Sequence, residues 1–307
     1  MMKLKSFHIA IILLFFFFLM TLWIESIPGY LPVLLSETIF LTALAMSLNI
    51  ITGSTGYLPF GLHFLFGMGG YVYAISIIKF GLPVYFALIF SGLIGLLSSS
   101  FFGFLASKIK GAYFAIATLA IAESMRYIFV NWDYVGGGYG MTLPPVFHLL
   151  DFYILSLLVL VLATLSFYLI QKNEKLRIAL AAIKENEEVA KICGINVTWP
   201  KFMVMIIGGL FISMLGGVWV HYQTYITPSF AFNEMYTVIA VGACLLGGIG
   251  SFQGVLLGGL IFAIIREYSW LIFPEIFLLV LGLSLIITVH FFPDGLFHYL
   301  EQKFGKR

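Results

Sequence analysis

The sequence predicts an all-α, polytopic integral membrane protein with about ten transmembrane helices. Of its 307 residues, 61% are hydrophobic and 10% are charged, whereas soluble domains carry about 25% charged residues. Mean hydropathy is +1.06, and the 32 Phe residues exceed what one aqueous core would bury. The apolar runs are long and continuous rather than alternating, which favours helices over a transmembrane barrel.

The first apolar run covers residues 7–24 and follows Lys3 and Lys5. It is 18 residues long, and the polar stretch after it contains no small-x-small cleavage site. A secretory signal peptide normally ends in such a site. We therefore interpret the run as a retained first helix.

Nine further apolar segments follow, and a helix needs ~20 residues to cross the hydrocarbon core. The segment at 235–249 is short and rich in glycine, so counts of eight or nine helices stay open. We predict that 1–307 forms a single transmembrane domain containing one long polar loop, 171–201. The nine segments lie at about 31–52, 60–78, 82–106, 112–130, 149–170, 202–222, 235–249, 252–272 and 275–292.

The basic residues predict the orientation of these segments. With ten helices and a cytoplasmic N-terminus, 13 of the 16 Lys and Arg residues fall on the cytoplasmic side, as the positive-inside rule requires. We therefore expect both chain ends and the 171–201 loop in the cytoplasm. The 13 are Lys3, Lys5, Lys108, Lys110, Lys172, Lys175, Arg177, Lys184, Lys191, Lys201, Lys303, Lys306 and Arg307; the exceptions are Lys79, Arg126 and Arg266.

The polar loop has an incomplete amphipathic pattern. Its apolar stripe is predicted at Leu180, Ile183, Val189 and Ile192, and this spacing indicates one or two short helices. Gly194 is placed to end a helix in the left-handed conformation. The pattern alone also fits a solvated connector. The predicted polar surface consists of Arg177, Lys184, Glu185, Glu187, Glu188 and Lys191.

Several blocks of the chain resemble one transporter family. Glu188-Val189-Ala190 followed by Gly194 resembles the E-A-A-x3-G signature of ABC-importer permeases. The wider run 177–197 resembles the cytoplasmic loop of the LivM-type permease of branched-chain amino acid importers. Four further blocks agree in the family's order, and the resemblance covers about 35–300. These blocks lie at 56–71, 110–120, 136–141 and 246–254.

The resemblance implies a subunit of a larger importer in a bacterial or archaeal cytoplasmic (inner) membrane. Its partners would be two ABC ATPase subunits, a homologous H-type permease subunit and an extracytoplasmic substrate-binding protein. ATP and Mg would bind to the ATPase partners, and this chain would bind no cofactor. The residues expected to couple the chain to the ATPase are Arg177, Lys184, Glu187, Glu188, Ala190 and Gly194.

The chain departs from the family pattern at three positions. Pro59 replaces the usual Ser, Leu62 replaces the usual His, and Tyr139 stands where Ser is common. These positions lie in segments that could line the transport path. Urea and amides therefore stay open as substrates beside branched-chain and related amino acids.

The sequence lacks the motifs of several other classes of function. It contains no G-x-x-x-x-G-K-[ST] phosphate loop, no metal-ligand spacing and no nucleophile elbow. The net charge of +2 does not suggest a nucleic-acid partner. Cys193 and Cys244 suggest neither a disulfide framework nor a metal cluster. An intramembrane enzyme is disfavoured, and a stand-alone secondary transporter or channel remains the alternative.

Charged residues inside the apolar segments are costly unless they pair or face a cavity. Glu123 and Arg126 are three residues apart on one helix face, which predicts an ion pair or, alternatively, a position on the translocation path. We expect Glu37 to be structural and His63 to be a packed polar residue. The adjacent pair at 266–267 is expected at the membrane interface.

Two groups of glycines interrupt apolar segments. Glycine permits close helix packing, but broken helices also form substrate sites in transporters. Pro59 and Pro228 add further breaks, and the polar loop 131–147 is expected on the outer face. The candidate path residues are Gly67, Gly69, Gly70, Glu123, Gly247, Gly248 and Gly250.

Overall fold

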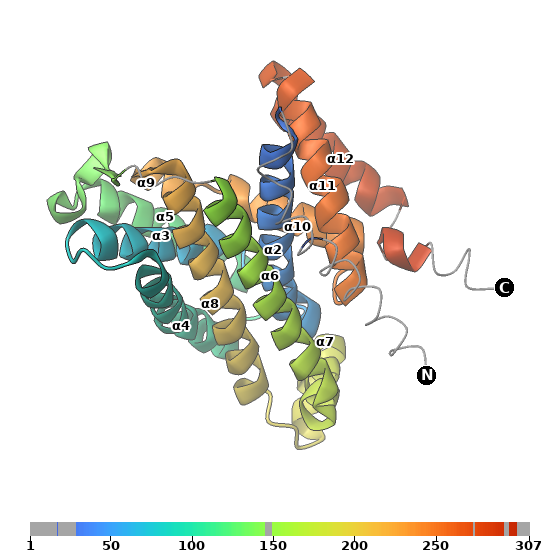
Figure 1. The fold of residues 1–307 in the computed structure, drawn as a ribbon. Helices are drawn as coiled ribbons and strands as arrows, with labels where there is room; N and C mark the ends of the chain where they lie inside the picture. Colours follow the sequence, from blue (N-terminus) through green and yellow to red (C-terminus); the bar gives the residue numbers. More distant parts are fainter. Residues whose placement is uncertain (1–16, 18–28, 145–148, 273, 292–294, 300–307) are drawn as a thin grey trace. The chain divides into compact units, whose positions relative to one another are not determined.

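The computed structural model describes residues 17, 29–144, 149–272, 274–291 and 295–299, and Figure 1 shows its helices in chain order. The predicted first helix at 7–24 therefore lies outside the described residues, apart from Phe17. The helices are α2 (Leu31–Thr55), α3 (Leu62–Ile78), α4 (Val84–Lys108), α5 (Gly111–Val130), α6 (Leu149–Lys172), α7 (Glu174–Ile192), α8 (Thr198–Gln223), α9 (Pro228–Ala231), α10 (Met235–Gly247), α11 (Phe252–Ile272) and α12 (Phe277–Phe291).

The all-α membrane class is confirmed. Within the described ranges, seven helical segments are long and apolar enough to cross a bilayer, and two more apolar helices are shorter. The predicted number of ten is not confirmed. One of the seven spans combines α9 and α10, because α10 alone has only 13 residues.

Several hydroxyl side chains within the helices are satisfied by their own helix. Ser36, Thr42, Ser47 and Ser76 each donate to the carbonyl oxygen four residues earlier, at 2.7–2.8 Å. Such bonds matter because a bilayer core offers no water to polar groups. The apolar segments therefore tolerate these residues without a partner helix.

The described part of the chain forms two compact units. Over the described residues, unit 1 comprises 17, 29–49, 149–164, 238–272, 274–291 and 295–299, and unit 2 comprises 50–144 and 165–237. The helices α2, α6 and α10 contribute residues to both units.

The centre of unit 2 is a close contact of α3, α4 and α8. A Cβ added at Gly69 would overlap the carbonyl oxygen of Ser213 in α8, and one added at Gly95 in α4 would lie 2.7 Å from the carbonyl oxygen of Gly209. Small residues thus let these backbones approach, as in other membrane helix contacts.

The glycines of α3 are packing positions on a continuous helix. The helix runs unbroken from Leu62 to Ile78, which supports the close-packing interpretation of these glycines over the alternative of a broken helix. A Cβ at Gly67 would lie 2.5 Å from the Phe232 ring, and one at Gly70 would lie 2.9 Å from Val220 Cγ2. Both glycines therefore contact neighbouring segments of unit 2.

In unit 1, the second glycine group does break the apolar segment. Helix α10 ends at Gly247, and Gly248 and Gly250 follow with φ of 103° and 88°, a region that glycine adopts without steric cost. The Gly250 N–H donates to Asn49 Oδ1 at 2.8 Å. The glycines here therefore make a tight turn before α11.

Contacts within unit 2 bring together loops that the predicted topology places on the same face of the membrane. On one side, Lys79 Nζ donates to the carbonyl oxygen of Tyr134 at 2.6 Å, and β1 (Met141–Thr142) pairs antiparallel with β2 (Tyr225–Ile226). The loop expected on the outer face is built, over its described part, of two 3-10 turns and strand β1. Which group of loops faces the cytoplasm stays a prediction.

Candidate functional site

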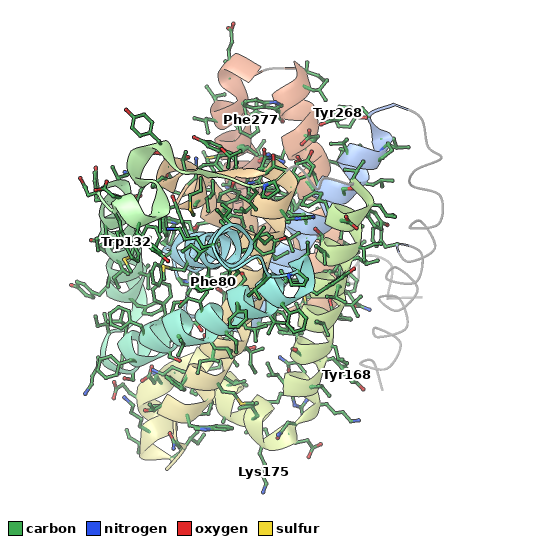
Figure 2. All side chains as sticks on the ribbon, turned by 60° about the vertical axis from the view of Figure 1, so that its left-hand side comes forward. Phe80, Trp132, Tyr168, Lys175, Tyr268 and Phe277 are labelled. Atoms are coloured by element: carbon green, nitrogen blue, oxygen red, sulfur yellow. The ribbon has the colours of Figure 1, made fainter. Side chains whose placement is uncertain are left out.

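The polar loop between α6 and α8 folds as two short helices. Helix α7 is interrupted at Asn186, whose backbone is extended (φ −159°, ψ 106°). The Asn186 side chain accepts hydrogen bonds from the N–H groups of Glu188 and Val189, at 3.0 and 3.2 Å, and so caps the second helix. Asn173 caps the first helix through the Leu176 N–H. Figure 2 shows Lys175 pointing away from the ribbon at the start of α7.

The second helix ends at a left-handed glycine, as the sequence predicts. Gly194 has φ of 79°, and its N–H donates to the carbonyl oxygen of Lys191 at 3.0 Å. The next N–H, of Ile195, donates to the carbonyl oxygen of Ala190 at 3.0 Å. This pair of bonds is the Schellman motif. Ala190 and Ile195 also join one apolar cluster with Ile183 and Val197.

The face that α7 packs inward differs from the predicted stripe. Leu180 and Ile183 are buried as expected, but Val189 and Ile192 are 53% and 86% exposed. The break at Asn186 rotates the second helix relative to the first, so one continuous 3.6-residue period does not describe both. The buried positions of α7 are Leu176, Leu180, Ile183, Glu187 and Ala190.

Glu187 is the centre of a buried polar cluster. It is 8% exposed, and it lies 3.1 Å from Nζ of Lys201, which is only 1% exposed. The Tyr57 hydroxyl donates to the same carboxylate at 2.6 Å, and Lys201 also donates to the carbonyl oxygen of Ala106 at 2.6 Å. Lys191 forms a second ion pair with Glu187 at 3.1 Å. The cluster thus joins α7 to α8, to α4 and to the segment after α2.

The environment of Glu187 favours its charged form. Burial raises the pKa of this carboxyl, but hydrogen bonds from Tyr57, Lys201 and Lys191 outweigh burial, and the pKa lies below its ordinary value. Because the folded-state pKa is lowered, the stabilisation is complete above the ordinary glutamate pKa and is lost as pH falls through the folded value. Above the ordinary glutamate pKa, the hydrogen bonds therefore favour the charged carboxylate of Glu187 in this cluster.

The sequence did not single out Lys201 or Tyr57 as functional. Their contacts with Glu187 span 14 and 130 residues along the chain, so no local spacing indicates them. The only sequence signal is a lysine in the first turn of a strongly apolar helix, where a charge needs a partner.

The outward side of the site is more open. Lys110, just before α5, donates to Glu188, and both side chains are largely exposed. The hydrogen bond from Lys110 lowers the pKa of Glu188. Lys184 Nζ donates to the carbonyl oxygen of Gly53 at 3.3 Å, and Arg177 is half-buried. A pocket of about 520 Å³ lies between the end of α2, the start of α5 and the break in α7.

The charged residues expected at 123–126 and at 266–267 form ion pairs in the structure. Arg126 donates to Glu123 at 2.6 and 2.9 Å, which confirms the ion pair in α5. The expected position of the pair at 266–267 at the membrane interface stays a prediction. Arg266 is 23% exposed and pairs with both Glu37 and the 7%-exposed Glu267, which also accepts a hydrogen bond from Tyr30.

In the part of the chain that the structure describes, these features define a multi-pass helical membrane protein in which the polar loop at 171–201 folds onto helix ends of unit 2. The chain belongs to the family described as "Branched-chain amino acid transport system / permease component", whose model matches residues 30–289.

Individual relatives agree with this assignment. The high-affinity branched-chain amino acid transport system permease protein LivM of Salmonella typhimurium is 25% identical over 294 residues, covering 84% of this chain and 68% of the relative. LivM of Escherichia coli is 24% identical over the same shares. The probable permease protein LivH of Methanocaldococcus jannaschii is 26% identical over 155 residues, 50% of this chain and 45% of LivH. No solved structure matches significantly.

Proposed function

We propose that the chain is the membrane permease subunit of an ABC importer in a bacterial or archaeal cytoplasmic membrane. It moves branched-chain or related amino acids into the cytoplasm, and separate ATPase subunits hydrolyse the ATP. Family membership and the branched-chain amino acid transport function of the LivM relatives support the substrate class. The similarity to LivH supports a second, homologous permease as a partner. An extracytoplasmic binding protein supplies the substrate in this proposal.

One observation supports the coupling part of the proposal: one side of α7 is buried and ion-paired within unit 2, and the other side is exposed. Glu187 is tied to Lys201 inside unit 2, whereas Val189 and Ile192 are exposed apolar side chains beside Glu188 and Gly194. An ATPase surface that docks on the exposed side would displace α7 and, with it, the buried side that carries Glu187. The ion pair would then transmit this movement to the start of α8.

The structure divides the expected coupling residues into two groups. Glu187 and Ala190 are buried, so in this proposal they position the loop. Glu188, Lys184 and Gly194 are exposed and are available for contact with the ATPase. Arg177 lies in the first half of α7, before the break at Asn186.

Transport by the reconstituted complex tests the proposal. The tagged chain is purified from native membranes with its copurifying subunits, and uptake of leucine, isoleucine, valine, other amino acids, amides and urea is measured in proteoliposomes. We expect ATP- and binding-protein-dependent uptake of at least one amino acid. Uptake that needs neither ATP nor a copurifying ATPase would instead support a stand-alone transporter, and uptake of urea or amides alone would correct the substrate class.

Substitutions at Gly194 separate a docking surface from a simple connector. No atom lies within 4 Å of a Cβ placed there, so the chain itself sets no steric limit, but the left-handed φ strains most L-residues by about 1–2 kcal/mol. We expect Gly194→Trp to lower recovery of the ATPase by roughly tenfold, while the permease still reaches the membrane. A tenfold loss corresponds to a weakening of the binding free energy by about 1.4 kcal/mol, which lies within the range of this strain.

Gly194→Asn is the matched control, since asparagine tolerates the left-handed region. It should retain most ATPase binding in the same pull-down. Equal, normal ATPase recovery and uptake in both variants would identify the loop as a solvated connector.

A further inference from the structure

A second polar cluster in unit 2 lies among the apolar helices. His63 is in the first turn of α3, Glu123 and Arg126 are in α5, and Thr237 is in the first turn of α10. Arg126 directs both its Nε and its Nη2 bonds to Glu123 Oε2, and His63 Nδ1 lies 2.9 Å from Thr237 Oγ1. These bonds leave His63 Nε2 and Glu123 Oε1 facing each other at 3.9 Å.

The His63 side chain is fully buried and only half satisfied. Its exposed fraction is 0%, and its Nε2 makes no hydrogen bond to any residue that the structure describes. Buried polar atoms without partners are exceptions in native proteins. The distance of 3.9 Å exceeds a hydrogen bond, but a third group placed about 2.9 Å from both atoms would bond to each.

The two charged residues of the cluster are partly exposed and lie deep along α5. Glu123 and Arg126 are 33% and 32% exposed. Glu123 precedes Val130, the last residue of α5, by seven positions, which is about 10 Å along a helix. Charged side chains at such depth in a membrane face a protein partner or a water-filled cavity rather than lipid. This edge of α5 is therefore suited to contact a polar solute.

The charges in the cluster match a zwitterion. Glu123 and Arg126 cancel, and the exposed Glu234 adds a negative charge that acts on both His63 and Arg126. Arg126 bonds to Glu123 through Nε and Nη2, and its Nη1 makes no hydrogen bond to any residue that the structure describes. The cluster thus offers acceptors for a cation beside one guanidinium donor for an anion.

We propose that His63, Glu123 and Arg126 form a binding site for the α-ammonium and α-carboxylate groups of an amino acid on its path through this chain. The ammonium bridges Glu123 Oε1 and His63 Nε2, and the carboxylate accepts from Arg126 Nη1. This requires the imidazole tautomer in which Nδ1 donates to Thr237 Oγ1, leaving a lone pair on Nε2. The substrate class rests on the proposed import function, whereas the site geometry does not.

Ligand-dependent thermal stability tests the site directly. The melting temperature of the full-length chain, in its copurified complex without binding protein, is measured with about 10 mM leucine, isoleucine or valine, because a ligand that binds only the folded state stabilises it. 2-Hydroxy-4-methylpentanoate, in which a hydroxyl replaces the ammonium of leucine, is the matched ligand control. We expect at least one amino acid to raise the melting temperature and the hydroxy acid to have no effect.

Two variants distinguish a binding site from a structural ion pair. Glu123→Gln removes the carboxylate, and the double exchange Glu123→Arg with Arg126→Glu keeps the pair but places a guanidinium beside His63. Both should require at least tenfold more amino acid for the same shift. Glu174→Gln, at an exposed position in α7, should keep the wild-type shift.

The outcomes separate this site from the import function. A wild-type response in Glu123→Gln or in the double exchange overturns the site, as does the absence of any wild-type shift with an amino acid that the complex transports. Absence of ATP-dependent uptake in proteoliposomes refutes the import function alone. An ammonium-dependent shift that Glu123→Gln abolishes would still establish the site.

Discussion

Glu187→Gln is expected to destabilise the permease by roughly 3–5 kcal/mol, because removing one partner leaves the buried Lys201 charge uncompensated. Lys201 is 1% exposed, and its ammonium loses its carboxylate partner at 3.1 Å. The second helix of α7 should then detach from the start of α8. Thermal melting of the purified chain and recovery of the ATPase in a pull-down would both fall.

The neighbouring residue provides the control for Glu187→Gln. Glu188 carries the same side chain but is 68% exposed and pairs with an exposed Lys110, so Glu188→Gln should leave the melting temperature unchanged while weakening the ATPase contact. Equal destabilisation by both substitutions would contradict the role assigned to the buried pair.

Removing both charges should restore most of the stability. Glu187→Leu combined with Lys201→Met replaces the ion pair by apolar side chains, an exchange that is often neutral or stabilising. The pH dependence provides a second check. Because the pKa of Glu187 is lowered on folding, the stability difference between wild type and Glu187→Gln should shrink as pH falls below the ordinary glutamate pKa.

Gly69→Ala is expected to cost about 3 kcal/mol or more, since overpacking a close contact forces backbone shifts. The new methyl group would overlap the Ser213 carbonyl oxygen, which also accepts the hydrogen bond from Ser91 at 2.6 Å. Helices α3 and α8 would have to separate, and the Ser91 bond would be lost. The yield of monodisperse protein and its melting temperature measure this effect.

Gly282→Ala, in α12, is the matched helical control. No atom lies within 4 Å of a Cβ at Gly282, and alanine has the higher helix propensity by up to about 1 kcal/mol. This variant should melt at or above the wild-type temperature. A Gly69→Ala protein that folds normally but no longer transports would instead place Gly69 on the translocation path.

Several features of the described helices are predicted by local sequence patterns alone. The apolar runs predict the bounds of α2, α4 and α5 to within a few residues, because hydrophobic length alone selects a spanning helix. The i,i+3 pair in α5 and the left-handed end at Gly194 are likewise properties of neighbouring residues. Each depends on helix geometry within a single turn.

The structures of the two glycine groups could not be predicted from local sequence. Both have similar composition, yet Gly67–Gly70 lie within a continuous helix and Gly248 and Gly250 form a turn. Glycine permits close packing as well as a left-handed backbone. The neighbours supplied by α8 in one case and by Asn49 in the other distinguish the two outcomes.

The sequence by itself determined the membrane class, the order of the helices, the polar loop and its terminal glycine, because these depend on hydrophobicity and on contacts within a few residues. Only the tertiary structure decided which side of α7 is buried and which charges pair between residues distant in the sequence. Glu37 meets Arg266 across 229 residues, and Tyr57 meets Glu187 across 130. A buried charge requires a partner, but the identity of that partner depends on how distant helices pack.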